Sequence, residues 1–218
     1  YSNDTAGAPE RGELNKKAYF LAATGNSNFG YFGGGTNPST GAQSYVQRID
    51  YSNDVAEAVL KGSLSISPGG ITLHTAASNS NFGYFAGGQQ PGPPHVWHST
   101  VCRIDYSNDT PLAIVKGPLT SARASLSATS STSNALPKQY DSVPYVSGAF
   151  STQPIGTDYG YFGGGYNNPD YLATVDRLDY SNDTADASTK GPLSIARNRL
   201  AATGNQYYGY FGGGYFET

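Results

Sequence analysis

An internal repeat is the feature of this sequence that most constrains its fold. The phrase Gly-Tyr-Phe-Gly-Gly-Gly, with one alanine in its second copy, begins at Gly30, Gly83, Gly160 and Gly209, so successive copies start 53, 77 and 49 residues apart. A second phrase, Tyr-Ser-Asn-Asp, begins at Tyr1, Tyr51, Tyr106 and Tyr180. A fixed period in this range is typical of stacked structural units. Both phrases indicate a unit of about 50 residues, with one insertion of about 25 residues in the third copy.

Each unit is predicted to contain four short strands and no helix. In the third unit, residues 174–180 and a last segment reaching Lys190 flank a Ser-Asn-Asp turn, and too few residues remain for a crossover helix. Only 13% of the residues are charged, whereas the chain holds 28 glycines and 18 tyrosines, a composition that disfavours long helices. The sequence therefore predicts an all-β protein whose units are four-stranded antiparallel blades of a β-propeller.

The wording of the repeat resembles a known family. A double glycine after aromatic residues, a variable loop, and then Val-x-Arg-(Ile/Leu)-Asp before a polar turn are similar to the kelch repeat, and the likeness covers nearly the whole chain. The phrases Arg-Ile-Asp-Tyr-Ser-Asn-Asp-Thr and Lys-Gly-Pro-Leu-Ser also resemble kelch-like repeat proteins of marine bacteriophages. The tryptophan common in the last strand of kelch blades is missing here, so we expect Tyr, Leu and Val to fill that space.

One propeller domain spanning residues 1–218 follows, with units at about 14–61, 64–116, 119–190 and 193–218 plus 1–11. The third unit carries the insertion, residues 131–157. Two arrangements remain open. Either four blades close into a ring in which the two ends of the chain share one blade, or the sequence is part of a longer array with more blades. The absence of a starting methionine favours the longer array.

Residues that recur in every unit are expected to serve packing and turns, because one ligand site needs different residues from different units. The glycine triplets lack the Lys-Ser/Thr of a phosphate-binding loop, so we expect positive φ and close strand packing there. Arg48 with Asp50, and the equivalent pairs, lie on one strand face and are expected to form charged contacts between blades. The Tyr-Ser-Asn-Asp phrase is interpreted as a turn; calcium binding is the alternative.

The variable loops after the second strand are the predicted binding surface. They cover residues 36–44, 89–99 and 166–173, and in kelch-like proteins such loops project on one face. Flat rings beside amides suit sugars, which stack on an aromatic face while their hydroxyls form hydrogen bonds. The candidate ligand-binding residues are Tyr45, His95, Trp97, His98, Tyr166, Asn167, Asn168 and Tyr171. Trp97 could instead cap a neighbouring blade.

The loops leading into the first strands add two basic candidates. Arg123 and Arg197 occupy equivalent places in the third and fourth units, where some kelch propellers hold acidic peptides or sugars. Exposed charge without a ligand is the alternative. The insertion at residues 131–157 is rich in Ser, Pro and Tyr, and we expect it to project from the opposite face.

Several other functions are disfavoured. The 13 basic residues are scattered and the net charge is -3, which is unlike a nucleic-acid-binding surface. The apolar runs are too short to cross a bilayer. Cys102 has no second cysteine to pair with and falls at a strand position, so it fits a copper-radical site poorly. A metal cluster of His74, His95 and His98 is conceivable, but we expect no metal and no cofactor.

The sequence therefore predicts a non-enzymatic binding module on a virion or another extracellular surface, such as a phage tail or appendage. Its expected ligand is a cell-surface glycan or a surface protein. The alternatives are a structural assembly protein that contacts sister subunits and, less favoured, an enzyme similar to galactose oxidase or to sialic-acid-processing propellers.

Overall fold

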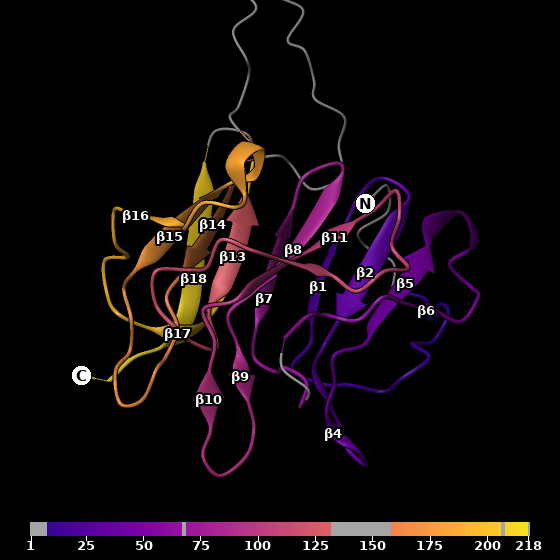
Figure 1. Ribbon diagram of the computed structural model, residues 1–218, viewed down its shortest axis with the longest axis horizontal. Helices are drawn as coiled ribbons and strands as arrows, with labels where there is room; N and C mark the ends of the chain where they lie inside the picture. The colour runs from indigo at the N-terminus through magenta and orange to yellow at the C-terminus, as the bar shows by residue number, and fades with distance from the viewer. Residues whose placement is uncertain (1–7, 67–68, 132–157, 206–207, 218) are drawn as a thin grey trace, which may run out of the picture.

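The computed structural model describes residues 8–66, 69–131, 158–205 and 208–217. These residues form three four-stranded antiparallel sheets and three two-stranded sheets, two of which are small hairpins in loops (Figure 1). Unit 1 contains β1 (Ala22–Gly25), β2 (Phe29–Gly33), β5 (Val46–Asp50) and β6 (Val59–Lys61). Unit 2 contains β7 (Thr75–Ser78), β8 (Phe82–Ala86), β11 (Val101–Asp105) and β12 (Ile114–Lys116). Unit 3 contains β13 (Ser127–Ser130), β14 (Tyr159–Gly163), β15 (Val175–Asp179) and β16 (Ser188–Lys190).

Unit 4 is shorter than the others. It contains β17 (Asn198–Gly204) and β18 (Gly209–Tyr215), which pair only with each other within the described part of the chain. Residues 1–11 were predicted to share this unit, and those of them that the structure describes, 8–11, form no strand beside β18. The all-β fold and the four strands of units 1 to 3 are thus confirmed. Closure into a four-bladed ring stays a prediction. No helix in the described ranges is long and apolar enough to span a bilayer.

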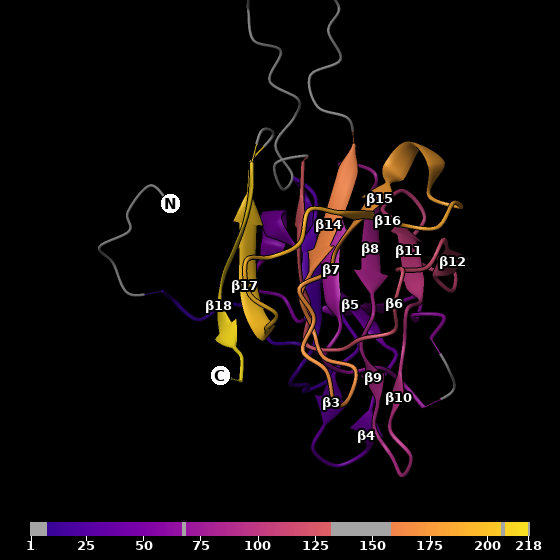
Figure 2. The same ribbon diagram turned by 90° about the vertical axis from the view of Figure 1, so that its left-hand side faces the viewer.

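The units stand in a row with their first strands next to one another. Strand β1 contacts β7, β7 contacts β13, and β13 contacts β17. Figure 1 shows the same order, with unit 4 at one end and unit 1 at the other, and Figure 2 views the row from the side of unit 4. Apolar side chains fill the spaces between units: one buried cluster holds Tyr31, Phe85 and Cys102, and the next holds Tyr84 and Phe162. Each sheet is therefore held mainly through its neighbours.

The glycine triplets make this close packing possible. A Cβ atom added at Gly33 would lie 2.7 Å from the Phe85 ring of the next unit, and one at Gly163 would lie 2.7 Å from Phe211. The following glycines, such as Gly34 at φ 63°, have positive φ in all four units. The structure confirms the packing role predicted for these glycines.

The Tyr-Ser-Asn-Asp phrase forms the expected turn. It begins the short 3-10 helices η1 (Tyr51–Asn53) and η2 (Tyr180–Asn182). The carboxylate of Asp50 accepts hydrogen bonds from the Ser52 amide (2.9 Å) and the Ser52 hydroxyl (2.6 Å). An equivalent pair joins Asp179 and Ser181. The aspartate before each phrase therefore caps the turn.

The last aspartate of the phrase binds the preceding unit. Asp109 of unit 2 accepts a hydrogen bond from the Tyr31 hydroxyl (2.9 Å) and forms ion pairs with Arg48 (2.7 Å) and Lys61 (3.1 Å) of unit 1. We call this arrangement the aspartate clamp. A second clamp joins unit 2 to unit 3 and consists of Asp183 with Tyr84, Arg103 and Lys116. Three donors from three different strands thus meet one buried carboxylate.

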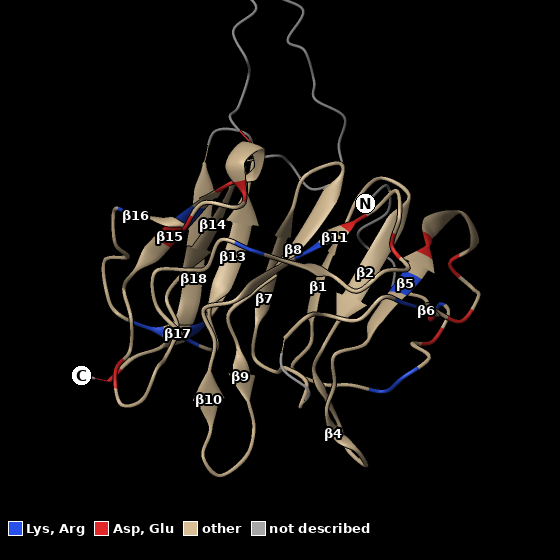
Figure 3. Cartoon of the chain, in the orientation of Figure 1, with Lys and Arg blue, Asp and Glu red and all other residues tan. Residues whose placement is uncertain are grey.

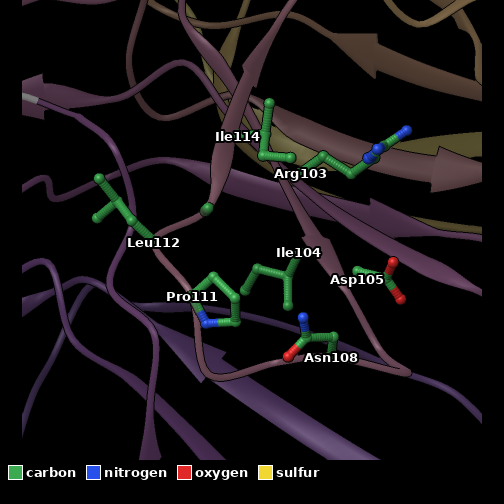
Figure 4. Close-up of a pocket in the computed structure, with 8 residues that line it drawn as sticks. Arg103, Ile104, Asp105, Asn108, Pro111, Leu112 and Ile114 are labelled. Carbon is green, nitrogen blue, oxygen red and sulfur yellow. The ribbon is translucent and has the colours of Figure 1, made fainter.

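The clamp corrects the pairing expected within each Arg-x-Asp motif. Arg103 does not pair with Asp105 of its own strand, and Figure 4 shows its side chain directed away from that carboxylate. It pairs instead with Asp183 in the next unit, because Asp105 already caps its own turn through Ser107. A charged contact between units was predicted correctly, but its acidic partner was wrong.

Replacing the clamp aspartate is expected to weaken the fold. Asp109→Asn removes the negative charge that compensates Arg48 and Lys61. Removing one partner of a buried ion pair lowers the stability of a protein by about 3–5 kcal/mol. The free energy of unfolding, measured in urea, should fall by that amount. Asp170→Asn, an exposed acid in a loop, is the control and should change it by less than about 0.5 kcal/mol. Equal effects would contradict the role of the clamp.

The clamp also predicts acid sensitivity. Burial by itself raises the pKa of Asp109, but hydrogen bonds from Lys61 and Tyr31 and the charge of Arg48 outweigh it and hold the pKa below its usual value. The stabilisation is therefore complete above about pH 4, the unfolded pKa, and is lost as pH falls through the lower folded value. Wild type should lose more stability than Asp109→Asn between pH 5 and pH 2, as measured by urea unfolding at each pH. Parallel losses would contradict this.

Candidate functional site

The variable loops extend from the same edge of the sheets, to one side of the row of units (Figure 1). The loop after β2 contains the hairpin β3 (Thr36–Asn37) and β4 (Gly41–Ala42), and the loop after β8 contains β9 (Gln89–Gln90) and β10 (Val96–Trp97). Both hairpins lie at the lower end of the views in Figures 1 and 2. These small hairpins were not predicted. Their common direction agrees with the predicted binding face, which we call the loop end.

Four residues at the loop end have an unusual backbone. Phe20, Leu73 and Ser125 lie two residues before the first strands of their units, and Arg199 is the second residue of β17. Their φ values are 58°, 57°, 56° and 55°. We call them the rim residues. Non-glycine residues in this left-handed region are strained, and the strain persists only where the surrounding structure imposes it. The same strain at equivalent places in four units is therefore a built feature of the fold.

Backbone hydrogen bonds connect the rim residues from unit to unit. The Leu73 amide donates to the Phe20 carbonyl (3.1 Å), the Ser125 amide to the Leu73 carbonyl (2.7 Å), and the Arg199 amide to the Ser125 carbonyl (2.8 Å). The left-handed conformation aims each amide at the unit before it. The rim residues thus form a continuous edge across all four units.

A pocket opens at this edge, and the rim residues line it together with Leu21, His74 and Leu126. His74 occupies the position that is leucine in units 1, 3 and 4. Its ring is buried, and neither nitrogen has a hydrogen-bond partner among the described residues. Burial lowers the pKa of His74 to about 4, and the nearby Gly33 backbone offsets only part of this effect. The pocket therefore has apolar walls, one neutral imidazole and the guanidinium of Arg199.

A tyrosine cluster lies beside unit 4. The rings of Tyr166 and Tyr171 are 5.3 Å apart, and that of Tyr171 is 5.6 Å from Tyr215. The Tyr166 hydroxyl donates to the Asn168 side-chain oxygen (3.0 Å). The structure therefore brings together three of the predicted residues, while Asn167 donates its backbone amide to Asp170 in the same loop.

The other predicted loop residues lie on unit 2 and unit 1. The rings of His95 and Trp97 are 6.3 Å apart in the β9–β10 hairpin, and Gln89 is hydrogen-bonded to His95. His98 is partly buried, which lowers its pKa, and its amide donates to the Gly88 carbonyl. Tyr45 precedes β5 and is 42% exposed. Among the described residues, no ring contact or hydrogen bond joins these side chains to the tyrosine cluster, so the loops offer separate aromatic surfaces.

Arg123 has a different position from the one predicted. Its side chain is 0% exposed and forms a 3.1 Å ion pair with Asp176, which is also 0% exposed. It also donates to the Phe162 carbonyl (3.1 Å), so it is inaccessible to a ligand and joins its loop to β15. Arg197, at the equivalent place in unit 4, is partly exposed and donates to the Gly213 carbonyl (2.9 Å). The prediction of an exposed contact is wrong for Arg123.

The remaining expectations concern metals, Cys102 and the insertion. The described residues contain no group of three His, Cys, Asp or Glu side chains that could hold a metal ion, so the conceivable three-histidine cluster is not formed. Cys102 is buried in β11, and burial raises the pKa of its thiol to about 12. Nearly all of the insertion, residues 132–157, lies outside the described residues.

The rim residues and His74 were missed as candidates for the pocket. A signal for them existed, because Phe20, Leu73, Ser125 and Arg199 differ from unit to unit although the alanines that follow them recur in several units. The strained backbone and the shared pocket, however, depend on contacts between units. No pattern inside one unit predicts them.

The buried ion pair between Arg123 and Asp176 can be tested with two matched variants. Arg123→Ala is expected to lower the free energy of unfolding by about 3–5 kcal/mol, because it leaves the Asp176 carboxylate buried without its cation. Arg197→Ala, at the equivalent position but partly exposed, should cost less than about 1 kcal/mol. Urea unfolding of both variants measures the difference. A larger loss for Arg197→Ala would contradict the assigned roles.

The burial of His74 predicts a second dependence of the stability of the fold on pH. Its folded pKa of about 4 lies below the unfolded value, so the unfolded chain takes up a proton first and stability falls as the pH drops from about 6.5 towards 4. His74→Leu introduces the residue found in the other three units. It should remove this pH dependence, which lowers the free energy of unfolding by up to about 3 kcal/mol. Urea unfolding between pH 7 and pH 4.5 tests it. Identical pH profiles would contradict the buried, neutral state of His74.

Comparison with known proteins gives no family for this chain. No protein-family model matches it, and no curated protein shows significant similarity to it. The kelch-like wording of the repeats therefore remains a resemblance. The loop end must be interpreted from its own chemistry.

Proposed function

We propose that the protein is a non-enzymatic binding module that takes carbohydrate at its loop end, on units that form kelch-like blades of a β-propeller. The observation that carries this proposal is the convergence of the variable residues on the loop end. Rim residues from all four units line one pocket there, and the tyrosine cluster projects from the same end. The recurring residues, by contrast, are used in turns and contacts between units.

The chemistry of this end suits a sugar. A pyranose ring presents C–H groups that pack on an aromatic face, and its hydroxyls need hydrogen-bond partners at the edge of that face. Tyr166 and Tyr171 supply the rings, and Asn168 lies within hydrogen-bond distance of the Tyr166 hydroxyl. In the pocket, Phe20 adds a ring that is 57% exposed, and Ser125 adds a hydroxyl.

The distribution of charged residues favours a neutral ligand. The loops 36–44 and 89–99 contain no Lys, Arg, Asp or Glu, and Figure 3 shows the β9–β10 hairpin without charged residues. The loop 166–173 contains one charged residue, Asp170, and the pocket contains one, Arg199. The acidic and basic side chains of the aspartate clamps are directed to the contacts between units instead. A neutral glycan thus fits the loops better than a phosphorylated or acidic polymer does.

We further propose that such a module functions on a virion or another extracellular surface, where it meets cell-surface glycans. This location rests on the resemblance to phage kelch-like proteins. A surface protein is the alternative ligand, and its signature would be binding that survives removal of the glycans from the target.

A glycan array and titration calorimetry test the proposal. Wild type should bind at least one neutral glycan, and Tyr171→Ala should weaken that binding about thirtyfold or more, the effect of losing an aromatic hot spot. Tyr208→Ala is the matched control, since Tyr208 is 64% exposed but lies in the β17–β18 turn at the other end of the sheet. Loss of binding in both variants, or no glycan binding by wild type, would contradict the proposal.

A further inference from the structure

Two polar side chains line the pocket at the loop end, which we call the rim pocket. They are Ser125 and Arg199. Among the described residues, no hydrogen bond or ion pair engages the Ser125 hydroxyl or the Arg199 guanidinium. Arg197, two residues earlier in the chain, is different, because it donates to the Gly213 carbonyl (2.9 Å). The rim pocket therefore offers a hydroxyl and a guanidinium as hydrogen-bond donors to a ligand.

The other walls of the rim pocket are mainly apolar. Leu126 is buried, and Leu21 and Leu73 are partly buried. Leu126 is held in place by the preceding unit, since a Cβ atom added at Gly87 would lie 2.9 Å from its side chain. A hydroxyl group placed against these leucines would lose its hydrogen bonds to water without gaining others, whereas a methyl group would be stabilised there.

These two features together specify one part of a ligand. The cavity has a volume of about 340 Å³, near the lower limit of the roughly 300–1,000 Å³ found for small-molecule sites. The acetamido group of an amino sugar has a methyl group for the leucine walls and a carbonyl oxygen that accepts hydrogen bonds. We propose that the rim pocket is a subsite for the acetamido group of an N-acetylhexosamine, an inference that rests on the proposed binding of glycans.

The rim pocket lies beside the tyrosine cluster, so a glycan can contact both. The Ala124 amide donates to the Tyr166 carbonyl (3.0 Å), and the Tyr166 amide donates to the Ala124 carbonyl (2.9 Å), which places Tyr166 next to Ser125. Burial raises the pKa of Tyr171, and the charge of Arg199 opposes that shift. The guanidinium is thus close enough to act on the Tyr171 hydroxyl. An amino sugar in the pocket leaves its neighbour in the glycan to stack on the tyrosine rings.

Other small groups fit the rim pocket less well. A carboxylate would be attracted to Arg199, but Asp170 and Glu217 lie beside the tyrosine cluster, where they repel an acidic glycan. The charge of Glu217 is, after burial, the next cause that raises the pKa of Tyr171. The methyl group of a 6-deoxy sugar would suit the leucines, but it has no acceptor for Ser125 and Arg199. The acetamido group satisfies both the apolar and the polar walls.

Two disaccharides that differ only in this group test the proposal. N,N′-Diacetylchitobiose has an acetamido group at C2 of each ring, where cellobiose has a hydroxyl. The methyl β-glycosides of N-acetylgalactosamine and galactose give the same comparison for the other configuration at C4. In at least one of these pairs, wild type should bind the acetamido sugar about tenfold more tightly or better, as measured by titration calorimetry.

Two substitutions that exchange rim residues between units test the site. Ser125→Phe introduces the residue that unit 1 has at this place, Phe20, and its ring would fill the pocket. Arg199→Leu introduces the residue of unit 2, Leu73, and removes the guanidinium. Each should lower the affinity for the acetamido sugar about tenfold and leave that for its hydroxyl counterpart unchanged. Far-ultraviolet circular dichroism establishes that each variant is folded.

Two further variants are the controls. Lys190→Leu removes an exposed cation from the outer strand β16, and it should change neither affinity. Tyr171→Ala should weaken both members of a pair by the same factor, because its ring stacks on the neighbouring sugar and not on the acetamido group. A loss that is equal for both sugars thus separates the tyrosine cluster from the rim pocket.

The possible results distinguish this inference from the proposed function. Equal affinities within both pairs, or a preference that survives both rim substitutions, would overturn the acetamido subsite. A glycan array on which wild type binds only glycans without an acetamido group would also overturn it, while leaving carbohydrate binding in place. Wild type that binds no glycan would contradict both proposals. If one rim variant does not fold, the other variant and the wild-type comparison decide the question.

Discussion

The aspartate clamp is the interaction on which the arrangement of this protein depends. Between units 1 and 2 and between units 2 and 3, one carboxylate, Asp109 or Asp183, enters the preceding unit and meets a tyrosine hydroxyl, a guanidinium and an ammonium group. These donors come from the second, third and fourth strands of one sheet, so the clamp fixes the whole width of that sheet against its neighbour. A single repeat unit cannot bury its apolar faces alone, and the clamp couples its stability to that of the next unit.

The loop end can vary because the clamps and glycines hold the units without it. The rim residues are joined by backbone hydrogen bonds, so Phe20, Leu73, Ser125 and Arg199 can differ in side chain while keeping one geometry. The loops after β2, β8 and β14 also differ in almost their entire sequence while the sheets that carry them stay alike. A fixed support with exchangeable surface groups is what a binding module requires.

The sequence alone was sufficient to predict the structure of one unit, but it was insufficient to predict the contacts between units. Strand positions, the glycine conformations and the Tyr-Ser-Asn-Asp turn depend on local geometry, and the structure confirms them. The partner of Arg103 and the burial of Arg123 were mispredicted because Asp183 and Asp176 lie 80 and 53 residues away along the chain. The pocket was missed for a similar reason: its walls come from four units, and its strained backbone arises where they meet.

The two clamps give unit 2 an acidic residue directed at the unit before it and basic residues directed at the unit after it, and this arrangement has an evolutionary consequence. A duplicated or transplanted unit brings its own acid for the unit before it and its own cations for the unit after it. Such units can be gained, lost or exchanged by recombination while the contacts between neighbouring units are kept. Tandem duplication thus offers a route to new ligand preferences that bypasses the slow accumulation of compensating core mutations.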